Sequence, residues 1–324
     1  MIVAKAVIKG LMRMAECSIL VLVLWLIVAL AALPMAAVLE DTIRSDVGAS
    51  RIHEDLRTGL DLSWLEEFHH RGEGLAETLQ PVRVSSAMVF ANLELWLDGS
   101  WMSENRSLAA AALLFLMIWI LLQGGVIAHL SSTDPGFRWG AFLTSCGRYF
   151  LRFLRLGLLM GVAYYGVYKL AYWLFPAIDD WTKDVTVERT VLIFHLGALC
   201  LVVGMMATVH LVADFAKIAT VKEGRRSMVL AVLRSVRQVA RHPLQSYGLL
   251  SVMFLMLALV QVTYAWIAPG VGGASPLALV VAFGAGQLYL LTRWALRIAR
   301  FGAEIELYSR WTEALSVPDE PVVP

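Results

Sequence analysis

Charged residues are scarce in this chain. Only 16% of its 324 residues are charged and 59% are hydrophobic, whereas an average soluble domain has about 25% charged residues. The mean hydropathy is +0.68. The formal net charge is +1, so no overall field points to nucleic acid as a partner. This composition excludes an ordinary soluble domain and indicates a membrane protein.

Cysteine is also rare. Cys17 and Cys200 lie in apolar segments and Cys146 lies in a basic one, while the acidic segments of the chain contain no cysteine. A disulfide framework is therefore not expected. We interpret the three thiols as small apolar side chains.

Common catalytic signatures are missing as well. The sequence contains no Walker loop, no dinucleotide glycine fingerprint, no Gly-x-Ser-x-Gly elbow and no paired Cys-x-x-Cys. We accordingly assign no catalytic, cofactor-binding or metal-binding residue and expect no cofactor.

Long apolar segments are what the sequence has instead. Segments of about 20 apolar residues span a hydrocarbon core of about 30 Å as helices, because peptide groups in lipid must pair within their own segment. Six such segments occur, at residues 17–38, 108–129, 156–175, 191–212, 249–267 and 277–296. The sequence predicts an all-α polytopic bundle of about six transmembrane helices.

The charges of the connecting segments predict the orientation. Residues 39–107 carry thirteen acidic and six basic residues, whereas residues 217–242 carry seven basic residues and one acidic residue. Basic segments stay on the cytoplasmic side. This rule places residues 1–16, 130–155, 213–248 and 297–324 inside. The same rule places residues 39–107, 176–190 and 268–276 outside. Both ends are then cytoplasmic.

The first apolar segment has a second interpretation. The basic residues before it and the small residues at 35–38 also describe a cleavable signal peptide. Its apolar run is long for that role, and cleavage would leave five spans with the same orientation.

The long outer segment is predicted to form a helical cap. Leu56, Leu60, Trp64 and Phe68 follow helical spacing before Pro81, and residues 87–97 form a second short apolar run. Within the first helix, Glu66, Glu67, His69, His70 and Glu73 cluster. A divalent ion is one interpretation of this cluster, and a solvated charged face is the simpler one.

Two inner segments, residues 137–156 and 227–241, are predicted to be basic amphipathic helices. Such helices lie among anionic headgroups, although these arginines also serve simply as topology-setting flanks. The candidate headgroup contacts are Arg148, Arg152, Arg234, Arg237 and Arg241.

Polar residues inside the spans are the remaining candidates, because they are costly there and often functional. His210 and Asp214 share a helix face. One interpretation is that the pair relays protons or binds a metal. The simpler one is that Asp214 pairs with a nearby arginine or faces water. Lys169 and His195 come to comparable depths, where Lys169 either binds a substrate or snorkels among tyrosines. The full set is Lys169, His195, His210, Asp214, Gln123 and Gln287. The pairs Gly157–Gly161 and Gly284–Gly286 predict close helix packing.

A short stretch resembles a known pattern. Asp214-Phe215-Ala216-Lys217-Ile218, Arg225-Arg226-Ser227 and Arg241-His242-Pro243 are similar to uncharacterised bacterial multi-pass membrane proteins. Some of these are similar to the membrane domain attached to glycerophosphodiester phosphodiesterases. The resemblance implies an inner helical segment between two spans, the next span starting just after the proline, and a bacterial inner-membrane location. It implies no reaction, because the phosphodiesterase catalytic domain is missing.

These patterns predict a non-enzymatic structural or accessory membrane component. Its expected partners are anionic lipids at the inner face, other membrane proteins or further copies of itself, and no nucleic acid. A small-solute transporter is the first alternative, since each half reads span, long connection, span, short connection, span. A lipid-acting intramembrane enzyme using His210 and Asp214 is the second.

Overall fold

The computed structural model describes residues 2–48, 62–71, 106–132, 136–267 and 276–316. These residues divide into two compact units. The first comprises Met1–Leu20, Trp119–Leu255 and Ala295–Pro324, and the second comprises Val21–Ile118 and Met256–Trp294.

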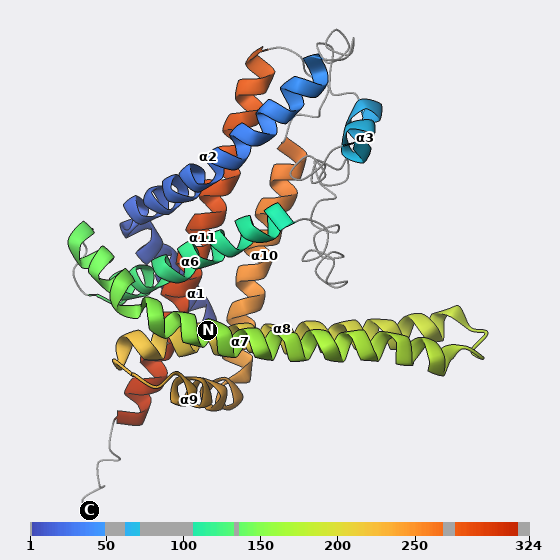
Figure 1. Cartoon of the computed structure of the whole chain (residues 1–324). Coiled ribbons are helices and arrows are strands. Elements are labelled where there is room, and N and C mark those ends of the chain that lie inside the picture. Colours follow the sequence, from blue (N-terminus) through green and yellow to red (C-terminus); the bar gives the residue numbers. More distant parts are fainter. Residues whose placement is uncertain (1, 49–61, 72–105, 133–135, 268–275, 317–324) are drawn as a thin grey trace, which may run out of the picture. The chain divides into compact units, whose positions relative to one another are not determined.

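The described residues form nine helices and no strand, so the predicted all-α class is confirmed. The helices are α1 (Ile2–Glu16), α2 (Ser18–Gly48), α3 (Leu62–Arg71), α6 (Arg106–Ser131), α7 (Trp139–Thr182), α8 (Glu188–Lys222), α9 (Met228–Arg241), α10 (Pro243–Ile267) and α11 (Pro276–Ser316) (Figure 1).

Five described helices are long and apolar enough to cross a membrane. They are α2, α6, α7, α8 and α10, and each contains one of the predicted spans, except that the first span was predicted to begin at Cys17, one residue before α2. The sixth predicted span, residues 277–296, lies within α11, which is not among these five. The sixth span therefore stays a prediction.

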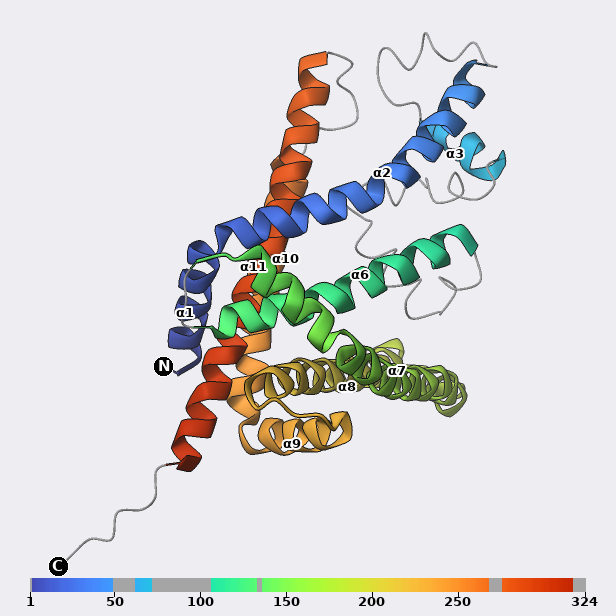
Figure 2. The same cartoon turned by 60° about the vertical axis from the view of Figure 1, so that its left-hand side comes forward.

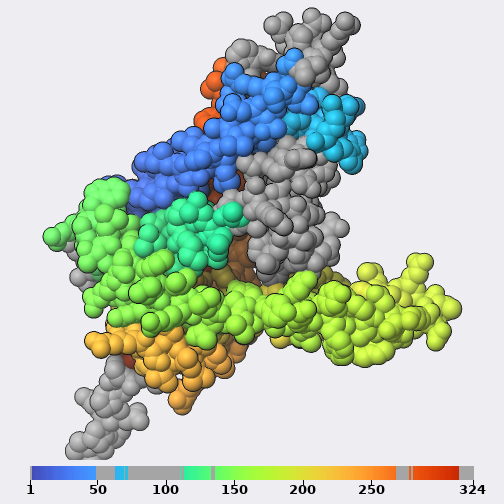
Figure 3. Space-filling view, viewed as in Figure 1, coloured from blue at the N-terminus to red at the C-terminus, as the bar shows by residue number. Residues whose placement is uncertain are grey.

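In the first unit, α7 and α8 form a long antiparallel hairpin (Figures 1 and 2). Val167, Ala171 and Val202 are buried in the seam between the two helices. Many outward-facing side chains are apolar too, such as Val162 at 73% and Leu192 at 65% exposure. Figure 3 shows the hairpin projecting as a rod of exposed atoms. A surface of this kind is matched to lipid rather than to water.

Helix α7 corrects one predicted boundary. Residues 137–156 were expected to form a separate amphipathic helix, but α7 runs without a break from Trp139 to Thr182. The physical reason is local, since a single Gly157 costs a helix only about 1 kcal/mol relative to alanine. At 1.5 Å per residue, the 44 residues of α7 extend for about 66 Å. The arginines of this segment therefore extend a candidate span.

The second inner segment is a separate helix, α9. Ser227 caps it by accepting a hydrogen bond from the backbone N–H of Leu230. Helix α10 then begins directly at Pro243, at the first-turn position that proline favours. Helix α9 thus connects two candidate spans.

The closest helix crossings occur at glycines that the sequence reading did not select. A Cβ on Gly10 of α1 would lie 2.3 Å from the carbonyl oxygen of Ala299 in α11, and one on Gly302 would lie 3.2 Å from the Cα of Gly10. A Cβ on Gly125 would lie 2.5 Å from Sγ of Cys146. The two backbones at the α1–α11 crossing therefore meet with no room for a side chain.

The predicted packing at Gly157–Gly161 and Gly284–Gly286 is wrong among the described residues. A Cβ at Gly161 or Gly284 would meet nothing within 4 Å, and Gly157 and Gly286 make only ordinary contacts at 3.7 Å. Glycine spacing along one helix does not specify which face another helix covers.

The second unit contains the described part of the cap. Trp64, Leu65 and Phe68 of α3 are buried against Ile43 and Val47 of α2. The indole of Trp64 donates a hydrogen bond to Asp46 at 3.1 Å. The remainder of the predicted cap, including residues 87–97, lies outside the described residues.

Candidate functional site

A cluster of buried charges lies where α8 packs against α11 in the first unit. Asp214 of α8 is only 1% exposed, yet each of its carboxylate oxygens accepts a hydrogen bond from a cation. Nζ of Lys217 donates to Oδ1 at 2.8 Å, and Nη2 of Arg300 donates to Oδ2 at 2.8 Å. Lys217 follows Asp214 by three residues on the same helix face, whereas Arg300 comes from α11. Asp214 is therefore fully paired.

His210 joins this cluster through Arg300. Nη1 of Arg300 lies 2.7 Å from Nε2 of His210. A guanidinium has donors and no acceptor, so Nε2 accepts the hydrogen bond and the ring proton is assigned to Nδ1. Nε2 also lies 3.4 Å from Oδ2 of Asp214, but with no proton on Nε2 this approach is not a hydrogen bond. The guanidinium thus links His210 to Asp214 and blocks a direct proton relay between them.

Glu304 is the second buried carboxyl of the cluster. It is 1% exposed, and Nε of Arg300, four residues earlier on α11, lies 3.4 Å from Oε1. Its Oε2 has no hydrogen-bond partner in the described part of the chain. Burial and the negative charge of Asp214 raise the pKa of Glu304 to about 8. At neutral pH this carboxyl is therefore mostly protonated, which avoids a second anion beside Asp214.

Glu306 forms a second charged centre, which connects α1 to α11. Lys9 donates to it at 2.8 Å, Arg13 at 3.2 Å and Arg310 at 3.1 Å. Burial alone would raise the pKa of Glu306, but hydrogen bonds from Lys9 and Arg310 outweigh it and hold the pKa below its ordinary value. The basic N-terminal helix is therefore bound through Glu306 as well as through the Gly10 crossing.

Glu223 forms a third centre, at the turn between α8 and α9. It accepts a hydrogen bond from the hydroxyl of Tyr308 in α11 and pairs with Arg225 and Arg234. Burial opposes ionisation here too, but the hydrogen bonds from Tyr308 and Arg225 hold the pKa of Glu223 below its ordinary value. The three acidic centres together join α1, α8, α9 and α11.

Lys169 and His195 do not form a common site in the structure. The ammonium of Lys169 lies over the rings of Tyr165 and Tyr172 at 5.5 and 5.7 Å, which matches the snorkelling interpretation. Nε2 of His195 lies 3.0 Å from Asp179 of α7, and its Nδ1 lies 3.0 Å from the carbonyl oxygen of Val191. Each residue is engaged with its own local partners.

The two candidate glutamines, Gln123 and Gln287, are surrounded by other groups of the protein. Gln123 is buried in α6 at 5% exposure. In the second unit, Gln287 of α11 accepts a hydrogen bond from the indole of Trp25 in α2 at 2.9 Å. Gln261 of α10 accepts another from the hydroxyl of Tyr289. The last two are interhelical hydrogen bonds of the kind that joins membrane helices.

The cluster of acids and histidines predicted in the cap lies partly outside the described residues. Glu66 and His70 are exposed on α3, and Glu67 pairs with Arg71 four residues later at 3.3 Å. The side chain of His69 and all of Glu73 fall outside the description, so the ion-binding interpretation stays an untested prediction.

Sequence reasoning missed Arg300, Glu304 and Glu306, three residues central to these centres. One signal was present, because Arg300 and Glu304 are four residues apart in a predominantly apolar stretch of the C-terminal helix. Their connection to Asp214 was not visible, since Arg300 and Asp214 are separated by 86 residues.

Comparison with known proteins finds no matching family model, no matching curated protein and no matching solved structure. The resemblance of residues 214–243 therefore gives no family assignment. Within the described residues, five helices are long and apolar enough to cross a membrane, as in a multi-pass membrane protein.

Proposed function

We propose that this chain is a non-enzymatic, multi-pass membrane component whose inner basic helices bind anionic phospholipid headgroups. The observation that carries the proposal is the surface of α9. One face packs inward through Met228, Ala231 and Val239, while Leu233 and Val236 on the outer face are 59% and 47% exposed. Apolar side chains on the outer face of a basic helix are suited to the acyl boundary of a bilayer.

Two arginines of α9 are free for headgroups. Arg237 and Arg241 are exposed, and neither forms an ion pair with any described residue. The other candidates are engaged, since Arg234 pairs with Glu223 at 3.2 Å. Arg148 and Arg152 lie over the ring of Tyr149 at 5.7 and 5.6 Å. We therefore assign the headgroup contacts of α9 first to Arg237 and Arg241.

The engagement of the intramembrane polar residues supports a non-enzymatic role. A lipid-acting enzyme would need a free base beside water, but Nε2 of His210 accepts from Arg300 and both oxygens of Asp214 accept from cations. These residues hold helices together, and a group held in this way is not available to take a proton from a substrate.

Lipid retention tests the proposal. The purified full chain is placed in nanodiscs of equal phosphatidylglycerol and phosphatidylcholine, and the retained lipids are identified by native mass spectrometry. We expect enrichment of phosphatidylglycerol, reduced by about threefold to tenfold when Arg237 and Arg241 are both changed to glutamine. Changing Lys183 and Arg189 in the predicted outer loop removes the same charge and serves as the control. Equal retention of the two lipids by the unmodified chain would contradict the proposal.

The proposal includes a bacterial inner membrane with both chain ends in the cytoplasm. The location rests on the resemblance of residues 214–243, and the orientation rests on the charge of the connecting segments. Reporter fusions should place Glu73 outside and Ser227 inside. The appearance of both reporters in one compartment would overturn the orientation.

A small-solute transporter is the second candidate, and Glu304 favours it. Glu304 is a buried carboxyl next to the Asp214–Arg300 pair, and one of its oxygens has no hydrogen-bond partner among the described residues. Groups of this type titrate in proton-coupled transporters. Uptake assays test this candidate with Glu304→Gln and with alanine at Lys169, His195, His210 and Asp214 in turn. Unchanged flux in all five variants would remove it.

A further inference from the structure

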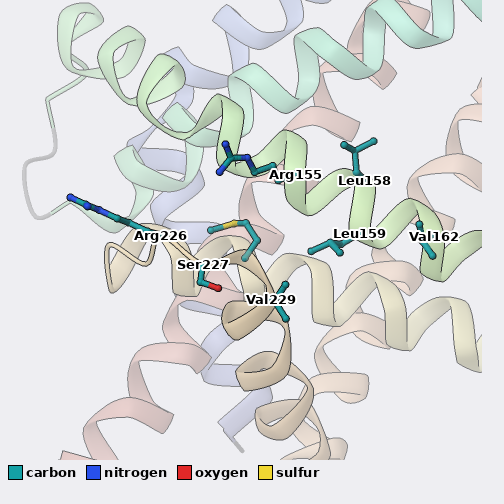
Figure 4. Close-up of a pocket in the computed structure, with 8 residues that line it drawn as sticks. Arg155, Leu158, Leu159, Val162, Arg226, Ser227 and Val229 are labelled. Carbon is teal, nitrogen blue, oxygen red and sulfur yellow. The ribbon is translucent and has the colours of Figure 1, made fainter.

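A pocket of about 460 Å³ lies between α7 and the first turn of α9, within the first unit (Figure 4). Its volume falls within the range of about 300–1,000 Å³ that is usual for small-molecule sites. Arg155, Leu158, Leu159 and Val162 line it from α7. Arg226 and Ser227, just before α9, and Met228 and Val229, in its first turn, line it from the other side. None of these residues was selected as a ligand contact from the sequence.

One end of the pocket is cationic. Arg155 and Arg226 are both exposed, and within the described ranges neither forms an ion pair. Arg155 belongs to α7, whereas Arg226 lies in the connection just before α9, so the two guanidiniums come from the two segments that line the pocket. The beginning of α9 adds the partial positive charge of a helix N-terminus, capped by Ser227. This end of the pocket is complementary to a phosphate group.

The rest of the wall is apolar and leads away from these charges. Leu158, Leu159 and Val162 follow Arg155 at spacings of three, four and seven residues, which places them along one face of α7. Val162 lies about 10 Å along the helix from Arg155. Leu158 and Val162 are 67% and 73% exposed, so the wall is open to its surroundings.

The apolar wall of the pocket runs along the segment of α7 that is predicted to cross the bilayer. Arg155 ends the basic stretch of α7, and the apolar stretch of residues 156–175 begins immediately after it. A phosphate held at Arg155 would therefore lie at the interface, with a chain extending along Leu159 and Val162 into the hydrocarbon.

We propose that this pocket binds one anionic phospholipid, with its phosphate between Arg155 and Arg226 and an acyl chain along the apolar face of α7. The proposal rests on the proposed lipid-binding function and adds a single defined site to it. Pairing of the charges selects the headgroup, and lateral opening of the wall allows the lipid to enter from the bilayer.

Photocrosslinking in nanodiscs tests the site. A benzophenone amino acid replaces Val162 in the full chain, the nanodisc contains equal phosphatidylglycerol and phosphatidylcholine, and mass spectrometry identifies the adduct. Two guanidiniums should favour phosphatidylglycerol by up to about thirtyfold. The same probe at Ile193, an exposed position on α8 outside the pocket lining, should show no comparable preference.

Two double variants separate the pocket from the general surface. Arg155→Gln with Arg226→Gln should bring the adduct ratio close to one, whereas Arg237→Gln with Arg241→Gln removes the same charge and should leave the ratio at position 162 nearly unchanged. Val229→Glu keeps all four arginines and places a negative charge in the pocket. It should also abolish the preference, and so tests the site if the first variant does not fold.

The site would be overturned by an equal adduct ratio in the unmodified chain, by a preference that survives both pocket variants, or by an adduct to a second protein copy in place of lipid. If the Arg237→Gln, Arg241→Gln variant lost the phosphatidylglycerol preference at position 162 as fully as the pocket variants, the pocket site would be overturned. The proposed function would still stand. Equal retention of the two lipids by the chain as a whole would remove both.

Discussion

Replacing Asp214 with asparagine tests whether the buried cluster holds the first unit together. The substitution keeps the shape of the side chain and removes its charge. Lys217 and Arg300 then lose their anion, although their side chains are only 17% and 18% exposed. Removing one partner from a buried ion pair costs about 3–5 kcal/mol, because the remaining charge stays desolvated. Since both cations retain some access to solvent, we expect a loss near the lower end, about 3 kcal/mol.

A matched control is available in the same hairpin. Asp179 also pairs with a histidine, His195, at 3.0 Å, but its side chain is 67% exposed. Asp179→Asn should therefore cost less than about 1 kcal/mol. Thermal unfolding of both variants in one detergent, followed by size-exclusion chromatography, measures the difference.

A double variant checks the cause of the loss. Asp214→Asn combined with Arg300→Met removes both members of the buried pair, so the combined loss should be smaller than the sum of the two single losses by about 0.5–3 kcal/mol. The reasoning would be refuted if Asp214→Asn were no more destabilising than Asp179→Asn.

The remaining predictions concern α1 and α11. Gly10→Leu should lower the free energy of unfolding by about 1–3 kcal/mol and so lower the unfolding midpoint, because any Cβ there meets the backbone of Ala299. Gly161→Leu is the control, because a Cβ at Gly161 meets no described atom within 4 Å, and it should leave the midpoint unchanged. Equal effects of the two substitutions would contradict the close α1–α11 crossing. The pH dependence of the midpoint should change in opposite directions for two neutral substitutions. Because the pKa of Glu306 is lowered, its stabilising effect is present above its ordinary value of 4.5 and is lost as the pH falls below it, so Glu306→Gln should flatten the acid limb. The raised pKa of Glu304 makes stability fall between its ordinary value of 4.5 and about 8, so Glu304→Gln should remove that fall. Unchanged pH profiles would contradict both assignments.

The positions of the helices and spans followed from local properties of the sequence. Five predicted apolar segments lie within helices that meet the length and hydropathy of a span. This succeeded because a segment in lipid must satisfy its own peptide groups, so length and apolarity determine the helix without reference to neighbours. Helix α9 was likewise readable, since its cap at Ser227 and its periodicity are local signals.

Helix ends and tight crossings were less readable. Nothing in the sequence near residue 156 was strong enough to end α7, and only the structure shows it continuing to Thr182. The glycines chosen by spacing, Gly161 and Gly284, have no close described neighbour, whereas Gly10 and Gly302 meet across two helices. Spacing identifies a face of a helix, but the partner of that face is decided by packing.

The sequence by itself therefore determined that this is an all-α chain with apolar helices long enough to cross a bilayer, and it predicted which polar residues to suspect. The tertiary structure alone decided how those residues are used. Asp214 is paired with Arg300 from 86 positions later, and Arg155 shares a pocket with Arg226 from the connection before α9. Local energetics form a helix from its own residues, whereas a buried charge or a lipid pocket needs partners that only the folded arrangement brings together.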